Sequence, residues 1–198
     1  MFRLLSCFCF VIMGFGALAQ DPKSFTQYVD PFAGCEIGNT LVGPGNPFGM
    51  VKLGPDIMPP NNTTGYKLDK PIVGFSHNHL SGTGGGARYG NIMVIPQVGA
   101  VNIHDTSSIK YNEYAKPGYY TVTLGKEQGD VMAELTTTDH VGMHRYSFFV
   151  LDKPAVREAY IYGHKKPAAF DANILINVSS IINSKVYEVA SCVGGLVN

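Results

Sequence analysis

The sequence predicts an all-β protein built as an antiparallel β-sandwich. Three consecutive segments, 118–125, 130–138 and 142–150, alternate apolar and polar residues along their length. This period of two places every second side chain on one face, as in a strand with one buried side. No segment has a convincing helical period, and the short links between the three segments suit antiparallel hairpins.

The expected strands follow in order along the chain. Residues 34–99 are rich in loops because prolines interrupt helices and glycines separate the apolar runs; within them, 48–55 and 90–99 are predicted as short strands ended by proline or glycine. The three alternating segments come next, and 173–182 and 185–192 extend the series. The residues predicted to share a face within each alternating segment are Tyr120, Val122 and Leu124, then Val131, Ala133 and Leu135, then His144, Tyr146, Phe148 and Val150.

The first residues have the features of a secretory signal peptide. Arg3 precedes an apolar run from Leu4 to Leu18, and Ala17-Leu18-Ala19 supplies small residues for cleavage after Ala19. An uncleaved anchor is the alternative, although the run is short for a bilayer span of about 20 residues. Residues 1–19 are therefore predicted to be removed on export, which leaves 20–198 as one domain in the periplasm or outside the cell.

Composition excludes some partners. The formal net charge is zero and charged residues make up 15% of the chain, so nothing favours electrostatic binding to nucleic acid or to anionic lipid. No second apolar run is long enough to cross a membrane once the signal is removed. Of the 4 cysteines, only Cys35 and Cys192 follow the signal. They could pair in an oxidising compartment, but their spacing does not decide this.

The stretch GFSHNHLSGTGGGARYG, residues 74–90, allows several interpretations. A dinucleotide loop is disfavoured because no helix follows the glycines. His77 and His79 would face the same side of a strand and could bind a metal, with His104, Asp105 and Glu36 approaching in space. Glycine loops also let backbone amides approach a sugar closely, and Arg88 adds donors. A set of structural turns remains a fourth interpretation.

Several long motifs occur together in one order. They are YVDPFAG (28–34), GNTLVGPGNPFGMVKLGPD (38–56), IVGFSHNHLSGTGGGARYGNIMVIP (72–96), KPGYYTVTL (116–124), AELTTTDHVGMHRYSF (133–148) and ANILINVSS (172–180). In these motifs the chain resembles glycoside hydrolase family 92. The blocks GFSHNHLSGTG and PFGMVKLGPD are the most specific, and the likeness covers nearly all of the chain after the signal.

The resemblance implies a fold and an activity. Members of this family are exported, calcium-dependent exo-α-mannosidases that invert the anomeric configuration. They have an N-terminal β-sandwich packed on a C-terminal (α/α)6 barrel, and residues 20–198 resemble the sandwich, truncated at its C-terminal end. The general acid, the base and most or all calcium ligands are expected in the barrel, which this chain lacks. The sequence therefore assigns no catalytic residue and no metal ligand here.

The resemblance also implies sugar contacts from two loops. By motif position, the candidate substrate-binding residues are Gly38, Asn39, Thr40, His77, His79 and Arg88. The commoner family pattern has histidine at the position of Asn39, and a cysteine- and aspartate-containing version where GGGAR stands, so linkage preference stays open. For His77 and His79, pinning the loop against the barrel is an equal alternative to sugar contact.

Two functions follow as expectations. The first is the carbohydrate-contacting domain of a mannosidase that is inactive as this fragment, with a mannose-containing glycan and its own C-terminal domain as partners. The alternative is a stand-alone glycan-binding β-sandwich without catalysis. Neither expectation includes nucleic acid or a membrane as a partner.

Overall fold

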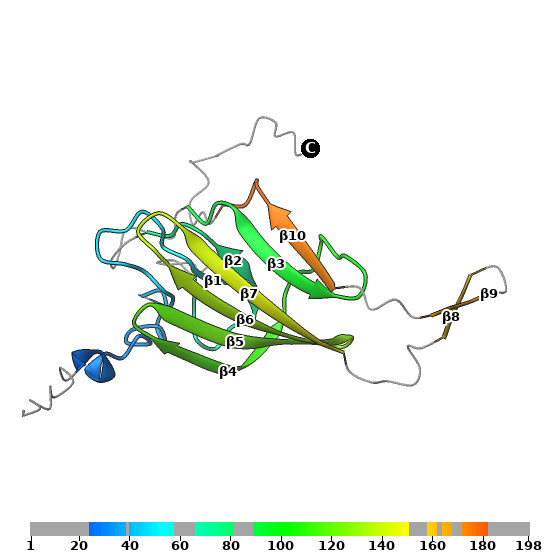
Figure 1. Cartoon of the computed structure of the whole chain (residues 1–198), viewed down its shortest axis with the longest axis horizontal. Coiled ribbons are helices and arrows are strands. Elements are labelled where there is room, and N and C mark those ends of the chain that lie inside the picture. Colours follow the sequence, from blue (N-terminus) through cyan, green and yellow to red (C-terminus); the bar gives the residue numbers. More distant parts are fainter. Residues whose placement is uncertain are drawn as a thin grey trace, which may run out of the picture.

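The protein forms two antiparallel sheets that pack as a sandwich (Figure 1). The structure is a computed structural model that describes residues 24–38, 40–57, 66–80, 89–150, 158–161, 164–167 and 172–181. Within these ranges the one helical element is a 3-10 turn, η1 (Phe25–Tyr28). No helix among them is both long and apolar enough to cross a membrane. The predicted all-β sandwich is thereby confirmed.

The first sheet has the strand order β1-β2-β3-β10. Its strands are β1 (Gly54–Ile57), β2 (Ile72–Ser76), β3 (Met93–Val98) and β10 (Ala172–Asn177). Every residue of β1, β2 and β3 is buried, so none of these strands alternates buried and exposed side chains. This explains why β2 was not predicted from the sequence.

Two predicted boundaries in the first sheet are wrong. The strand expected at 48–55 begins only at Gly54, and Phe48, with a positive φ of 60°, is not in the extended conformation. Pro55 was expected to end this strand but lies inside β1, while Pro96 lies inside β3 and within the predicted strand 90–99. β2 pairs only with Met93 and Val94, so Pro96 lies beyond the doubly paired part of β3, where a missing N–H is tolerated.

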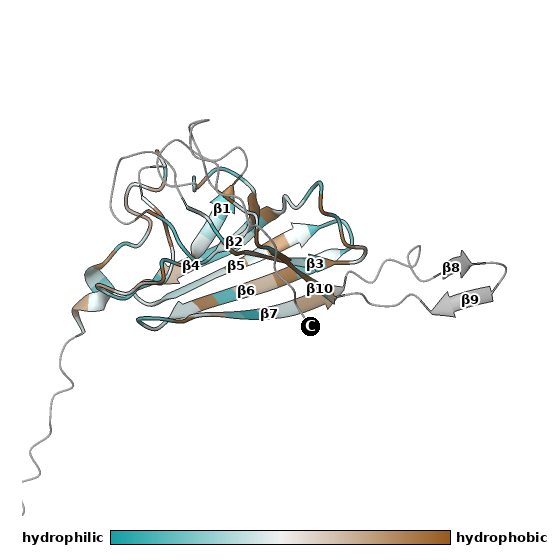
Figure 2. Cartoon of the chain, turned by 90° about the horizontal axis from the view of Figure 1, so that it is seen from above, coloured by the Kyte–Doolittle hydropathy of each residue, from teal (hydrophilic) through white to brown (hydrophobic). Residues whose placement is uncertain are grey.

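The second sheet has the order β4-β5-β6-β7. Its strands are β4 (Ile109–Lys116), β5 (Tyr119–Lys126), β6 (Gly129–Thr137) and β7 (Gly142–Val150). The last three match the alternating segments, and bands of high and low hydropathy alternate along β6 (Figure 2). A Pro117-Gly118 turn joins β4 to β5, and the φ of 79° at Gly118 suits the third position of a type II turn.

The core lies between the two sheets. Phe75 of β2 meets Tyr120 of β5 edge to face, with ring centroids 6.5 Å apart, and meets Tyr146 of β7 at 6.2 Å. The side chains predicted inward on β5 and β6 are all buried, which confirms the faces that the alternation predicted. Strands β8 (Glu158–Ile161) and β9 (His164–Pro167) form a separate antiparallel hairpin.

A bulge in β4 places a charged group in this core. Asn112 has a positive φ of 51°, and the β4–β5 register shifts between Tyr111 and Tyr114. The extra residue brings Lys110 and Glu113 to the same, inner face, although strict alternation would separate them. The broken alternation also hides β4 in the sequence.

Glu113 is the centre of a buried polar cluster. Tyr66 and Tyr120 each donate a hydroxyl hydrogen bond of 2.6 Å to its Oε1, and Lys110 Nζ lies 2.8 Å from its Oε2. Lys110 also donates to the Tyr66 hydroxyl at 2.5 Å. Burial, reinforced by Glu113, raises the pKa of both tyrosines far above the ordinary value, so both hydroxyls stay protonated donors.

Candidate functional site

The candidate site is a corner where several loops meet at the end of β2. We define this loop corner as residues 46–52, 77–80, 89–92 and 138–142. Lys52 N donates to His77 O at 3.0 Å, His77 N donates to Asn91 O at 3.3 Å, and Met50 N donates to Asp139 O at 2.7 Å. Backbone hydrogen bonds thus join segments that are far apart in sequence into one surface.

His79 is buried within the loop corner and makes hydrogen bonds through both ring nitrogens. Its Nδ1 lies 2.7 Å from the Lys52 carbonyl oxygen, and its Nε2 lies 2.7 Å from Asp56 Oδ1 and 3.1 Å from Ser76 Oγ. Burial by itself lowers the pKa of His79, but the Asp56 carboxylate and the Lys52 carbonyl together raise it above the ordinary value. The ring can then donate to both oxygens as an imidazolium, which fixes the loop against β1.

His77 is half-buried and belongs to a chain of hydrogen bonds that crosses between the sheets. Its Nδ1 lies 3.1 Å from the Ile92 carbonyl oxygen, which can only accept, so Nδ1 carries the proton. His77 Nε2 then accepts from His144 Nε2 at 3.2 Å, and His144 Nδ1 accepts from the Tyr146 hydroxyl at 2.7 Å. Burial and the proximity of His77 lower the pKa of His144 to about 4, so its ring is neutral at ordinary pH.

Gly38 and Thr40 make hydrogen bonds to the turn that precedes them. Gly38 N donates to Cys35 O at 3.1 Å, and Thr40 Oγ1 donates to Ala33 O at 2.5 Å. Cys35 is buried and carries a free thiol, 3.3 Å from Thr40 Oγ1. Cys192, its possible partner, lies outside the described residues.

The structure links the two predicted sugar loops through the segment before β1. An added Cβ at Gly43, just after the first loop, would lie 2.2 Å from the Leu53 carbonyl oxygen, so the two backbones are in close contact there. The neighbouring Lys52 carbonyl holds His79 of the second loop. Asn39 and Arg88 lie outside the described residues, as do residues 1–19.

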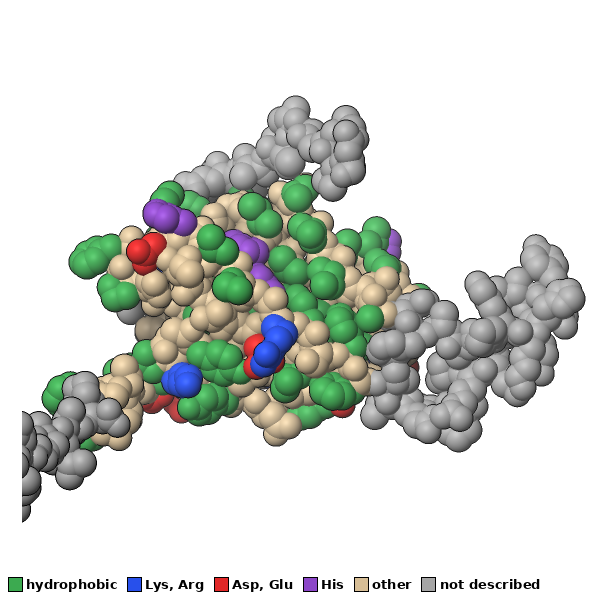
Figure 3. Space-filling view, viewed as in Figure 1, with side chains coloured by type: hydrophobic (Ala, Val, Ile, Leu, Met, Phe, Trp, Pro, Cys, Tyr) green, Lys and Arg blue, Asp and Glu red, His purple; other side chains and the backbone are tan. Residues whose placement is uncertain are grey.

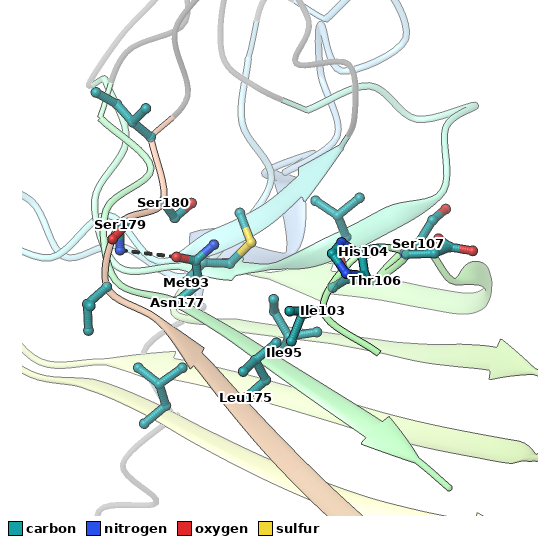
Figure 4. Close-up of a pocket in the computed structure, with 15 residues that line it drawn as sticks. Met93, Ile95, Ile103, His104, Thr106, Ser107, Leu175, Asn177, Ser179 and Ser180 are labelled. Atoms are coloured by element: carbon teal, nitrogen blue, oxygen red, sulfur yellow. Dashed lines mark hydrogen bonds between the residues drawn. The ribbon is translucent and has the colours of Figure 1, made fainter. Parts of the chain in front are cut away.

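Of two pockets lined by described residues, the larger lies elsewhere, on the outer face of the first sheet, and the sequence did not predict it. It has a volume of about 740 Å³, and its lining includes Val73, Met93, Ile95 and loop 103–107. Figure 4 labels Met93 and Ile95 of β3 and several residues of the loop. None of its lining residues belongs to the six predicted sugar contacts, and Asp105 is the one carboxylate among them. The sequence contained an indication of this pocket, since β2 and β3 carry apolar side chains on both faces.

Comparison with known proteins decides the family. Residues 28–191 match the glycosyl hydrolase family 92 N-terminal domain. The chain belongs to glycosyl hydrolase family 92. A relative in Arthroderma benhamiae, described as an uncharacterised secreted glycosidase, is 29% identical over 144 residues, which are 66% of this chain and 18% of that protein.

Solved family 92 structures agree with this. The family 92 α-mannosidase of Bacteroides thetaiotaomicron, in complex with mannoimidazole, matches with a TM-score of 0.61 and 28% identity over 79% of this chain and 20% of that chain. A second structure of that enzyme gives a TM-score of 0.60 at 27% identity. This chain therefore spans about a fifth of the length of these relatives.

The family resemblance raised the question of calcium. Calcium takes six to eight oxygen ligands, chiefly carboxylates, carbonyls and water. In the part of the chain that the structure describes, no group of three or more histidine, cysteine, aspartate or glutamate side chains is placed to hold a metal ion. The acidic side chains of the described residues therefore do not gather into a calcium site.

Proposed function

We propose that this chain is the N-terminal, carbohydrate-contacting domain of an exported α-mannosidase that acts on mannose-containing glycans. The observation that carries the proposal is the match to a family 92 α-mannosidase in complex with mannoimidazole, in which this chain corresponds to a fifth of the relative. In this proposal the chain shapes part of the sugar pocket, and its own C-terminal (α/α)6 domain completes the pocket.

The chemistry of the proposed reaction supports an inactive fragment. An inverting glycosidase needs two carboxyl groups roughly 6.5–9.5 Å apart, one to protonate the leaving oxygen and one to activate water. The larger described pocket has a single carboxylate, that of Asp105, in its lining. We propose that the acid, the base and the calcium ligands all lie outside this chain.

The six candidate residues take two roles in this proposal. His77 and His79 have both ring nitrogens in hydrogen bonds within the protein, so their role is to hold residues 77–80 in place. The sugar hydroxyls then meet the Gly38-Asn39-Thr40 segment and Arg88. Glycine permits close approach of the backbone, and the amide, hydroxyl and guanidinium supply matched donors and acceptors.

Exposed apolar side chains favour this proposal over a stand-alone glycan-binding domain. Phe48, Met50, Val141 and Met143 lie on or next to the loop corner, and each is more than half exposed. Figure 3 shows many hydrophobic side chains and few charged ones on the face that it presents. Exposed apolar side chains of this number are typical of a face covered by another domain.

The first experiment is the intact mass of the protein recovered from the exported fraction of its host. A mass several-fold above 21.4 kDa is expected, together with mannose release that is lost in a chelator and restored by calcium. The 198-residue chain alone, assayed at equal molarity, should release no mannose. A natural product that ends at Asn198, or mannose release by the short chain itself, would overturn the proposal.

A further inference from the structure

His77 and His144 place two imidazoles in contact where the two sheets meet. His77 follows β2 and His144 lies on β7, and their Nε2 atoms are 3.2 Å apart. Both rings are half-buried and so keep some exposed surface. The pair is therefore within reach of a small solute.

The ring geometry differs from that of a simple head-on hydrogen bond. Two imidazoles pointing straight at each other across this Nε2 separation would have centroids ~5.5 Å apart. The observed centroid separation is 4.8 Å, with an interplanar angle of 37°. Two rings bound to one ion at Zn–N distances of ~2.0–2.1 Å, with the observed nitrogen spacing, would have centroids ~5 Å apart and an N–Zn–N angle of ~100°. The observed separation is thus closer to that of two rings that share one ion than to that of a head-on pair.

The other nitrogen of each ring already has the partner that a metal ligand needs. His77 Nδ1 donates to the Ile92 carbonyl, and His144 Nδ1 lies 2.7 Å from the Tyr146 hydroxyl. Metal-binding histidines almost always have such a second partner, which orients the ring. Ile92 has a positive φ of 55°, a strained conformation for a β-branched residue, and its carbonyl is the one that orients His77.

Gly142 keeps the space beside the pair open. A Cβ at this position would lie 2.9 Å from His77 Cδ2 and 3.2 Å from His77 Nε2. Any other residue at position 142 would press on the nitrogen that faces His144. The absence of a side chain preserves both the ring position and the access to it.

From these observations we propose that His77 and His144 bind a divalent transition-metal ion of the zinc type through their Nε2 atoms. On binding, the proton of His144 moves from Nε2 to Nδ1, which then donates to the Tyr146 hydroxyl oxygen, so no net proton is released. Imidazole nitrogen suits zinc and its neighbours, whereas calcium prefers oxygen. Water fills the remaining coordination positions, which makes the site open and the ion exchangeable.

The test is calorimetric titration of the full 198-residue chain with zinc sulfate. One equivalent of zinc should bind, and His77→Ala and His144→Ala should each weaken binding at least about tenfold. Tyr146→Phe should weaken it by about tenfold to a hundredfold, because it removes only the partner of His144 Nδ1. His104→Ala is the matched control, since this exposed ring lies on the larger pocket, and it should leave the affinity unchanged.

A second measurement needs no variant and so remains decisive if a variant fails to fold. In the ¹⁵N-labelled wild-type chain, zinc should shift the Nε2 resonances of two of the 6 histidines, and calcium should shift neither. Cobalt should bind without the intense thiolate-to-metal absorption that cysteine ligation produces. Unchanged affinity in both histidine variants, a thiolate band, or shifts confined to other histidines would each overturn the proposal.

Discussion

Replacing Glu113 by glutamine tests whether the buried cluster in the β4 bulge stabilises the fold. The side chains of Lys110 and Glu113 are 9% and 10% exposed, so solvent screens this ion pair weakly. In Glu113→Gln the amide oxygen can still accept from Tyr66 and Tyr120, but the NH₂ group then faces the Lys110 ammonium. A buried charge loses its counter-ion, which costs about 3–5 kcal/mol when one partner of such a pair is removed.

Urea unfolding followed by circular dichroism measures this cost. With an m-value of about 2 kcal/mol/M, the unfolding midpoint should fall by roughly 1.5–2.5 M. The double variant Glu113→Gln with Lys110→Met should recover most of the loss, because replacing both partners of a buried pair is often close to neutral. A midpoint for Glu113→Gln within about 0.5 M of the wild type, or simple additivity in the double variant, would refute the reasoning.

Three further outcomes are expected. The raised pKa values of Tyr66 and Tyr120 keep both hydroxyls protonated in the folded state, so their contribution to the free energy of unfolding is complete below pH ~10 and falls above it by about 1.4 kcal/mol per pH unit for each tyrosine. In urea titrations at pH 9 to 11, the Tyr66→Phe and Tyr120→Phe variants should therefore lose less stability per pH unit than the wild type. An unchanged dependence on pH would contradict the claim. His79→Leu should lower the free energy of unfolding by about 3–5 kcal/mol, because the Asp56 carboxylate stays buried without the histidine that it contacts. An unfolding midpoint equal to that of the wild type would argue against a stabilising His79–Asp56 pair. Burial raises the pKa of the Cys35 thiol, so this thiol should not react with maleimide in the native protein. Cys35→Ser should therefore leave the number of reactive thiols unchanged in the native protein and lower it by one in urea. Rapid labelling of native Cys35 would oppose this view.

Local patterns account for much of the fold. Strands β5, β6 and β7 follow from alternation alone, since each has one face against the core and one face toward solvent. Strands β2 and β4 could not be predicted in the same way. β2 is buried on both faces and has no alternation, and the bulge at Asn112 shifts the phase of β4 in the middle of the strand.

The sequence by itself determined the fold class, the family motifs and the faces of three strands, because these depend on residues that are neighbours along the chain. Only the tertiary structure decided which distant side chains meet. His77 contacts His144, and Tyr66 contacts Glu113, because sheet packing and strand register bring them together. A single residue of register reverses the face of every side chain in a strand, so a bulge or a strained turn decides contacts that no local period contains.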